Sequence, residues 1–158
     1  MRADRVRTSW WPGLATAREC AAAAGARSAG SQHVLLALMG RDAEAVATVL
    51  REAGVDRPSV LAALQGITGT GRARAEPVPV EQVSVSPRVG ALLRRAAGGV
   101  AGEVDDLAVL GELLDDRGEP SVVRVVLTSL GARRRALRAY RSLTGTRVDD
   151  VDGDLVPG

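Results

Sequence analysis

The chain has too few residues of the kinds that hold metals or act as nucleophiles to build a catalytic centre. It contains one histidine, His33, and one cysteine, Cys20. A zinc site needs three or four ligands at suitable spacing, and nucleophilic catalysis needs a nucleophile beside a base. We therefore expect no enzymatic activity, no metal and no cofactor. His33 is expected to be a hydrogen-bonded structural residue, and Cys20 a small buried hydrophobe.

A Walker-type phosphate loop is excluded because the sequence contains no lysine, so that every cationic side chain is an arginine. The Gly-x-x-x-x-Gly-Lys-Ser/Thr loop that cradles nucleoside triphosphates requires its lysine. The glycine clusters that do occur, Gly98-Gly99 and Gly69-x-Gly71, do not follow a strand pattern. We expect no Walker-type ATPase in this chain.

A run of arginines near the end of the chain is a candidate surface for anions or nucleic acid. It consists of residues 133–135, Arg138 and Arg141. Leu137 and Tyr140 share this segment, which favours the solvated face of an amphipathic helix over a dedicated patch. The Asp-rich end of the chain also argues against nucleic acid, because it would repel phosphate or compete for the basic face.

Trp10 and Trp11 stand next to each other in a chain that is otherwise almost without aromatic residues. Phe is absent and Tyr occurs once, so the core has to be built from Leu, Val and Ala. The two tryptophans either close the open end of that core or stay exposed as a patch for a ligand or partner. Both interpretations remain open at this point.

Helices must position these residues, because apolar side chains recur at helical spacing along most of the chain. Within 43–53, for example, Val46, Val49, Leu50 and Ala53 fall at i, i+3, i+4 and i+7. The predicted helices cover 14–24, 31–39, 43–53 and 57–66, and then 87–98, 106–115, 120–130 and 132–143. The predicted N-caps are Ser31, Asp42, Asp56 and Ser86, and Gly54 is predicted to end a helix in a left-handed conformation.

Between the two sets of helices, glycines, prolines and alternating valines predict a linker over 67–84 that contains a short extended segment. The predicted organisation is all-α, with repeat one at 10–66, repeat two at 85–143 and a disordered acidic tail at 144–158. No apolar run approaches the ~20 residues of a membrane span, and we expect no signal peptide at the start of the chain. With a single cysteine, these features favour a cytoplasmic protein.

The two sets of helices repeat one sequence pattern. Ser31-Gln-His-Val-Leu-Leu-Ala-Leu-Met39 returns as Asp105-Asp-Leu-Ala-Val-Leu-Gly-Glu-Leu113, with an offset of 74 residues between His33 and Leu107. A second pair of segments repeats with an offset of 77 residues, between Gly54 and Gly131. Each copy is a helical unit that needs its neighbour to bury its apolar face.

Three segments carry a resemblance to a known family. They are Gln32-His-Val-Leu-Leu-Ala-Leu38, Val49-Leu-Arg-Glu-Ala-Gly-Val-Asp56 and Val85-Ser-Pro-Arg88. The chain resembles, over about residues 10–143, the N-terminal domain of Clp/Hsp100 unfoldases of the ClpA and ClpC type. That resemblance implies a domain that recognises substrates, adaptors and small cyclic peptides. Without an ATPase motif, we expect a stand-alone copy that binds rather than catalyses.

The resemblance also implies which residues bind. In ClpC-type domains that read phosphorylated arginine, a Glu beside the His accepts the guanidinium, and a Thr and an Arg near the first helix hold the phosphate. Here Gln32 replaces the Glu of repeat one, whose phosphate grip would fall in the ambiguous Arg5–Ser9 segment. Repeat two keeps Ser86 and Arg88 but has Asp106 for Glu. We expect phosphoarginine recognition to be lost in repeat one and weak in repeat two.

The predicted ligand-binding residues are Trp10, Trp11, Gln32, Val85, Ser86, Arg88 and Asp106. They would line an apolar groove where the helices at 14–24 and 87–98 approach each other. The leading hypothesis is a binding protein for a peptide, an adaptor or a cyclic peptide, with a decoy that protects the Clp unfoldase as one role. One alternative is a regulatory adaptor that docks on the Clp protease machine. A further alternative is an Arg-rich nucleic-acid-binding protein.

Overall fold

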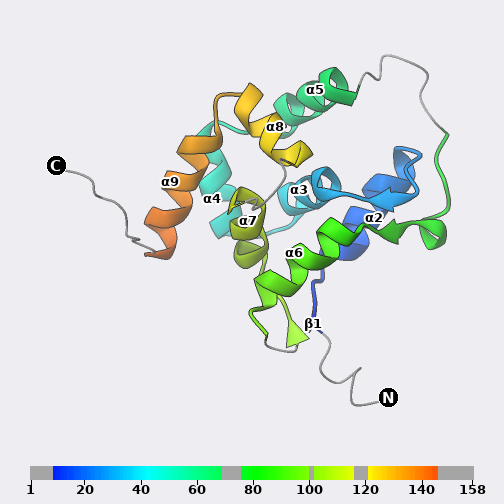
Figure 1. The fold of residues 1–158 in the computed structure, drawn as a ribbon. Helices are drawn as coiled ribbons and strands as arrows, with labels where there is room; N and C mark the ends of the chain where they lie inside the picture. Colours follow the sequence, from blue (N-terminus) through cyan, green and yellow to red (C-terminus); the bar gives the residue numbers. More distant parts are fainter. Residues whose placement is uncertain (1–8, 69–75, 100–101, 116–120, 146–158) are drawn as a thin grey trace.

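The computed structural model describes residues 9–68, 76–99, 102–115 and 121–145 of the chain. Its helices are α2 (Leu14–Ala23), α3 (Ser31–Gly40), α4 (Glu44–Ala53), α5 (Arg57–Thr68), α6 (Pro87–Ala97), α7 (Asp106–Asp115), α8 (Val122–Ser129) and α9 (Arg133–Thr144). Four two-residue strands and one 3-10 turn accompany them: β1 (Ser9–Trp10), β2 (Ser28–Ala29), β3 (Ser84–Val85), β4 (Gly102–Glu103) and η1 (Val80–Gln82). The predicted all-α fold is confirmed (Figure 1).

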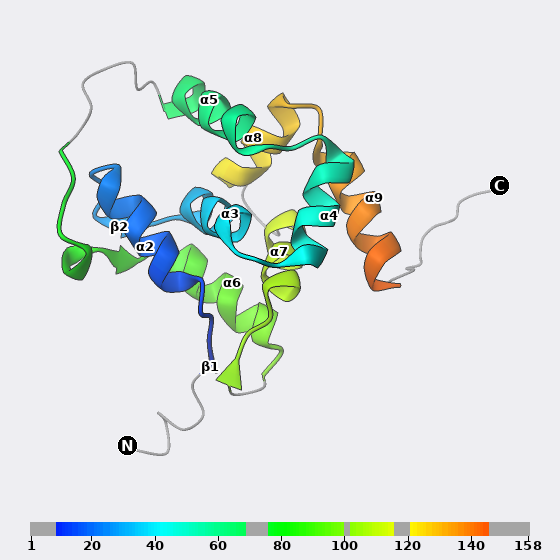
Figure 2. The same ribbon diagram turned by 180° about the vertical axis from the view of Figure 1, so that it is seen from behind.

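The two halves of the chain contain the same elements in the same order, namely a strand, a helix, a strand and three helices. Figures 1 and 2 show α3 and α7 at the centre, with α4 packed on α9 at one side and α5 packed on α8 at another. The fold is therefore a pair of pseudo-symmetric four-helix repeats, as predicted. The boundaries given above for the repeats stay predictions, and residues 69–75 of the linker and 146–158 of the tail lie outside the described residues.

The core consists of Leu, Val and Ala side chains together with one tryptophan, Trp11. α3 is buried on almost every side, since all its residues from Val34 to Leu38 are buried. α2 contributes Ala17 and Ala21, whose small side chains let its backbone lie close to α3 at normal interior packing density. Every helix in the described part of the chain is too short or too polar to cross a membrane.

The helix ends follow the sequence at some positions and depart from it at others. Ser86 caps α6 by accepting the backbone N–H of Val89 at 3.2 Å, and Gly54 ends α4 with a φ of 77°. Ser31, however, is the first helical residue of α3 and not its N-cap. The N-cap is Gly30, whose backbone N–H donates to Nδ1 of His33 at 3.0 Å, so the histidine supplies the cap. Likewise Ala43, and not Asp42, precedes α4.

The end of the linker is fixed to repeat one. The guanidinium of Arg18 on α2 donates to the carbonyl oxygens of Val83 at 3.1 Å and Val80 at 3.0 Å. Val83 is buried in a small second cluster with alanines of α2 and β2. Where the sequence predicted a short extended segment, the structure has a 3-10 turn, η1, followed by the two-residue strand β3.

The four short strands pair between the repeats and not within them. β1, at the start of repeat one, pairs in parallel with β4 of repeat two, in the register Ser9 to Gly102 and Trp10 to Glu103. β3, at the start of repeat two, pairs in parallel with β2 of repeat one, in the register Ser28 to Ser84 and Ala29 to Val85. The first strand of each repeat thus pairs with the second strand of the other repeat, which joins the two repeats into one unit.

Candidate functional site

This crossed pairing gathers the predicted ligand-binding residues into two clusters, each built from both repeats. β2 leads into α3 and β3 leads into α6, so the first turns of these helices are neighbours. We call this cluster the α3–α6 junction, which consists of Ser31, Gln32, His33, Val85, Ser86 and Arg88. β1 leads toward α2 and β4 toward α7 in the same way. This second cluster, the α2–α7 junction, consists of Trp10, Trp11, Arg41 and Asp106.

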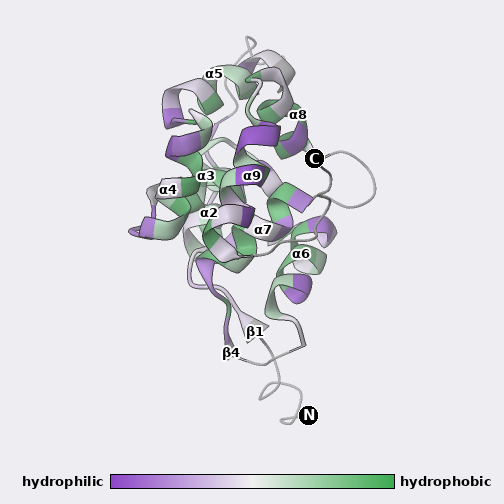
Figure 3. Cartoon of the chain, turned by 90° about the vertical axis from the view of Figure 1, so that its left-hand side faces the viewer, coloured by the Kyte–Doolittle hydropathy of each residue, from purple (hydrophilic) through white to green (hydrophobic). Residues whose placement is uncertain are grey.

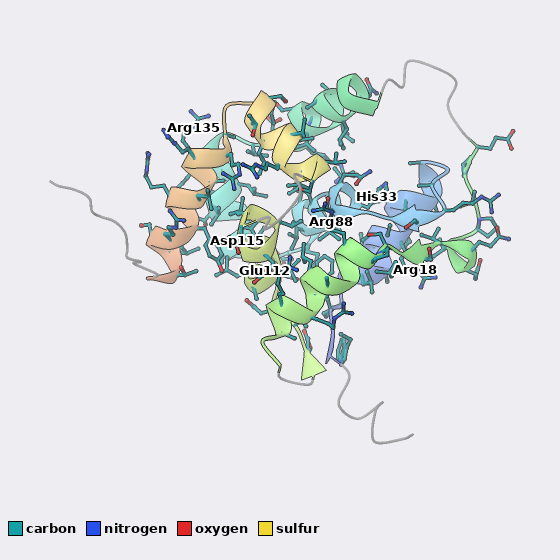
Figure 4. All side chains as sticks on the ribbon, viewed as in Figure 1. Arg18, His33, Arg88, Glu112, Asp115 and Arg135 are labelled. Atoms are coloured by element: carbon teal, nitrogen blue, oxygen red, sulfur yellow. The ribbon has the colours of Figure 1, made fainter. Side chains whose placement is uncertain are left out.

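The α3–α6 junction is held together by backbone hydrogen bonds. The Ser86 N–H donates to the Ala29 carbonyl at 3.1 Å, two residues before α3 begins. Figure 4 shows Arg88 and His33 where α6 meets α3. Arg88 is partly exposed, and Gln32 folds back over Gly30, where an added Cβ would lie 2.6 Å from Oε1 of the glutamine. None of the six junction residues carries a negative charge, so the α3–α6 junction is suited to an anion.

Two residues of this junction have buried polar side chains on the first turn of α3. Ser31 and His33 are only 4 % and 7 % exposed. Nδ1 of His33 accepts the Gly30 N–H, which places the proton of the neutral ring on Nε2. Within the described ranges, neither the Ser31 hydroxyl nor Nε2 of His33 has a hydrogen-bond partner. Such groups are costly to leave unpaired, which makes them candidates for ligand or water contacts.

Burial lowers the pKa of His33 below its ordinary value of 6.5, because the charged imidazolium loses its hydration. The unfolded chain therefore takes up a proton at a higher pH than the folded protein does. We expect the free energy of unfolding to fall as the pH drops below 6.5, the ordinary pKa of a histidine side chain in the unfolded chain. His33→Gln keeps an acceptor for the Gly30 N–H and cannot titrate in this range.

Urea unfolding of both proteins at about pH 7.5 and about pH 5 tests this expectation. The wild type should lose more stability than His33→Gln on acidification, since carboxylates titrate equally in both. Because the chain has no other histidine, the difference can be assigned to this residue. Parallel losses in the two proteins would contradict the prediction.

The α2–α7 junction is closed by Asp106, whose two carboxylate oxygens both accept bonds from repeat one. Oδ1 accepts the indole N–H of Trp11 at 2.6 Å, and Oδ2 accepts the Arg41 guanidinium at 2.9 Å. The Asp106 and Arg41 side chains are 15 % and 29 % exposed, so the pair is partly shielded from water. The carboxylate of this junction is thus already paired with an arginine of the chain itself.

The two adjacent tryptophans have opposite environments, which settles the alternatives left open by the sequence. Trp11 is 2 % exposed and forms part of the core, whereas Trp10 is 52 % exposed. The indole of Trp11 lies directly on Gly13, where an added Cβ would be 2.7 Å from Cε2 of the ring. Only glycine leaves room for the ring there. Trp11 closes the core, and Trp10 presents an aromatic surface to solvent.

The structure brings the predicted binding residues together in other combinations than the family resemblance implies. The family pattern couples Ser86 and Arg88 with Asp106, inside repeat two. In the structure Ser86 and Arg88 lie beside Gln32, and Asp106 lies beside the two tryptophans. Val85 is half-buried in β3 and packs against the core. Sequence reasoning missed Arg41, and no spacing signal could have found it, because it is 65 residues from Asp106.

A pocket of about 370 Å³ lies in repeat two, between α6, α7 and α9. It is lined by Arg95, Ala96, Ala108, Gly111, Glu112, Asp115, Leu137, Tyr140 and Arg141. The Nε of Arg95 and Oε1 of Glu112 form an ion pair at 2.9 Å on its rim. Burial, followed by the carboxylates of Glu112 and Asp105, raises the pKa of Tyr140. The inter-repeat groove predicted above stays a prediction.

These features define a helical double-repeat binding domain whose candidate sites combine side chains from both repeats. In the part of the chain that the structure describes, no group of three or more His, Cys, Asp or Glu residues could hold a metal ion. The family model of the Clp repeat N-terminal domain matches residues 6–114, more than half of the chain. The protein therefore belongs to the Clp repeat N-terminal domain family, which supports a Clp-related role in protein interaction. No curated protein matches the chain.

Proposed function

We propose that the protein recognises a peptide segment of a Clp substrate or adaptor by binding an anionic group of that segment at the α3–α6 junction. The observation that carries this proposal is the β2–β3 pairing, which brings Ser86 and Arg88 to the first turn of α3. A helix N-terminus with a nearby arginine is a favourable environment for phosphate or carboxylate. The protein acts by binding and has no catalytic step.

The crossed arrangement separates the two halves of a phosphoarginine site. The α3–α6 junction has the phosphate-binding side, but Gln32 offers an amide where a carboxylate would hold the guanidinium. The α2–α7 junction has the carboxylate of Asp106, but Arg41 already occupies it. We infer that the protein binds the phosphate group of a peptide and does not require the guanidinium of a phosphoarginine. Peptides with phosphoserine and with phosphoarginine should therefore bind with similar affinity.

Calorimetric titration of three matched peptides, carrying phosphoserine, phosphoarginine or no phosphate, tests this function. Arg88→Ala should weaken binding of both phosphopeptides by about tenfold, on the order of 1.4 kcal/mol, because a charge-assisted hydrogen bond is lost. Arg94→Ala is the matched control, since Arg94 is an exposed arginine on the same helix and lies outside the junction. Equal binding of the unphosphorylated peptide, or equal effects of the two variants, would rule out this role for the junction.

Docking on the Clp machine itself is a second candidate function, favoured by the exposed indole of Trp10. A large aromatic side chain on the surface is a common anchor at protein interfaces. In this role the protein acts as a regulatory adaptor, whereas a decoy binds its peptide or cyclic peptide without the machine. Co-purification of the wild type and of Trp10→Ala from cells distinguishes the adaptor from the decoy. The adaptor role requires that the unfoldase co-purifies with the wild type and is lost from the Trp10→Ala sample, whereas the decoy role does not.

A further inference from the structure

The last helix carries the highest concentration of positive charge in the described chain. α9 contains five arginines and no acidic residue. Arg133 has a structural task, since its guanidinium donates to the Leu114 carbonyl at the end of α7 at 3.2 Å. The other four, Arg134, Arg135, Arg138 and Arg141, are exposed, and we call them the arginine face.

The arginine face is a single surface of the helix. At about 100° per residue, the four positions fall within an arc of about 120°, on the side away from the buried Ala136 and Ala139. Arg134, Arg138 and Arg141 follow one another at i, i+4 and i+7, over a length of roughly 10 Å. Figure 3 shows hydrophilic residues along α9 on the side of the molecule that faces the viewer.

Among the described residues, Glu112 and Asp115 line the same pocket as Arg141, but no ion pair joins them to it. None of the four guanidinium groups has a hydrogen-bond or ion-pair partner among the described residues. Nearby carboxylates are used elsewhere, as in the pairing of Glu112 with Arg95. Like charges at i and i+4 repel each other and slightly destabilise a helix, so the stripe brings α9 no stability of its own. Unneutralised charge of this kind attracts a partner of opposite sign.

We propose that the arginine face is a docking surface for an acidic helical segment of a partner protein. A partner helix with carboxylates at i, i+4 and i+7 has the same rise per residue, so its charges match Arg134, Arg138 and Arg141 one to one. Arginine pairs well with carboxylates because its planar guanidinium can donate two parallel hydrogen bonds. This surface lies on α9, apart from the residues of both junctions, and the proposal does not depend on the function proposed for them.

A protein segment fits this surface better than nucleic acid does. Single-stranded nucleic acid is bound by aromatic platforms beside basic residues, and the arginine face includes no aromatic side chain. Tyr140 is half-buried against Gly111, and both tryptophans belong to the α2–α7 junction and not to α9. Charge-driven binding to duplex DNA strengthens with the number of phosphates that are neutralised, and four arginines neutralise only about four.

The test uses the full chain and three probes, with binding followed by fluorescence anisotropy. The first probe is a synthetic helical peptide with Glu at i, i+4 and i+7, and the second has the same composition with the Glu residues spread around the helix. The third is a duplex DNA. We expect the striped peptide to bind best, with an affinity that falls as salt is raised. The triple variant Arg134→Glu, Arg138→Glu, Arg141→Glu should bind it more than about tenfold more weakly.

A control with the same change of charge is Arg27→Glu, Arg51→Glu, Arg94→Glu, three exposed arginines outside α9. This variant should keep most of the binding, and circular dichroism should show both variants folded. Tighter binding of the DNA than of the striped peptide, equal losses in the two triple variants, or no binding of the peptide would each overturn the proposal. It would also be overturned if only a chain with Asp149, Asp150, Asp152 and Asp154 changed to Asn bound the peptide, since the chain's own acidic residues would then be the occupant.

Discussion

Replacing Trp11 with alanine is expected to lower the free energy of unfolding by about 3–5 kcal/mol, the usual cost of truncating a buried tryptophan. The side chain is 2 % exposed, packs on Gly13 and donates its indole N–H to Asp106 at 2.6 Å. The variant therefore loses apolar packing and also leaves a carboxylate oxygen without its donor. Urea unfolding followed by circular dichroism measures the effect without relying on the fluorescence of the altered residue.

Trp10→Ala is the matched control for this prediction, because it removes the same side chain one position away. Trp10 is 52 % exposed, and substitutions at such surface positions usually change stability by less than about 0.5 kcal/mol. The two variants should therefore differ several-fold in their effect. If they lowered the free energy of unfolding equally, the burial of Trp11 would not be what closes the core.

Asp106→Ala should be the next most damaging change, with a loss of about 2–3 kcal/mol in the free energy of unfolding. The carboxylate is 15 % exposed and accepts one bond from Trp11 and one from Arg41. Its removal leaves two donors of repeat one without their acceptor, and one of them is charged. Chemical denaturation at neutral pH checks the magnitude, and a double-mutant cycle with Arg41→Ala isolates the share of the ion pair.

Glu103→Ala provides the comparison, since Glu103 is an exposed carboxylate on β4, close to Asp106 in sequence. This variant should change the free energy of unfolding by less than about 0.5 kcal/mol. Asp106→Asn should fall between the two, because an amide oxygen still accepts the indole N–H but no longer attracts the guanidinium. An Asp106→Ala variant as stable as Glu103→Ala would mean that the Asp106 bonds contribute nothing to joining the repeats.

The helices and their repetition could be predicted from the sequence because they depend on local signals. The apolar stripe of α4, the serine before Pro87 and the glycine after Ala53 each act within a few residues, and the structure places all three as expected. The cap of α3 was missed because it is made by the third residue of the helix: Nδ1 of His33 accepts the N–H of the N-cap residue Gly30, whereas a serine cap would accept an N–H from the first turn.

The arrangement of the candidate sites could not be predicted in the same way. It depends on strands of only two residues, too short to show alternation, that pair positions such as Trp10 and Glu103 far apart in the chain. Sequence reasoning found Gln32, Ser86, Arg88 and Asp106 individually, but it grouped them by repeat. Exchange of the strands between repeats, which no local pattern encodes, decides which of these side chains meet.

The crossed strand pairing also indicates which oligomeric arrangement the two repeats correspond to. Each repeat lends its first strand to the other and receives one in return, in the same register and sense. Two identical copies related by a twofold axis would make this reciprocal exchange, which is the geometry of a domain-swapped homodimer. The protein is, in architectural terms, such a dimer on a single chain. Fusion leaves the two equivalent interfaces free to differ, and here one is held by hydrogen bonds of Trp11 and Arg41 to Asp106, while the other has Arg88 beside the first turn of α3.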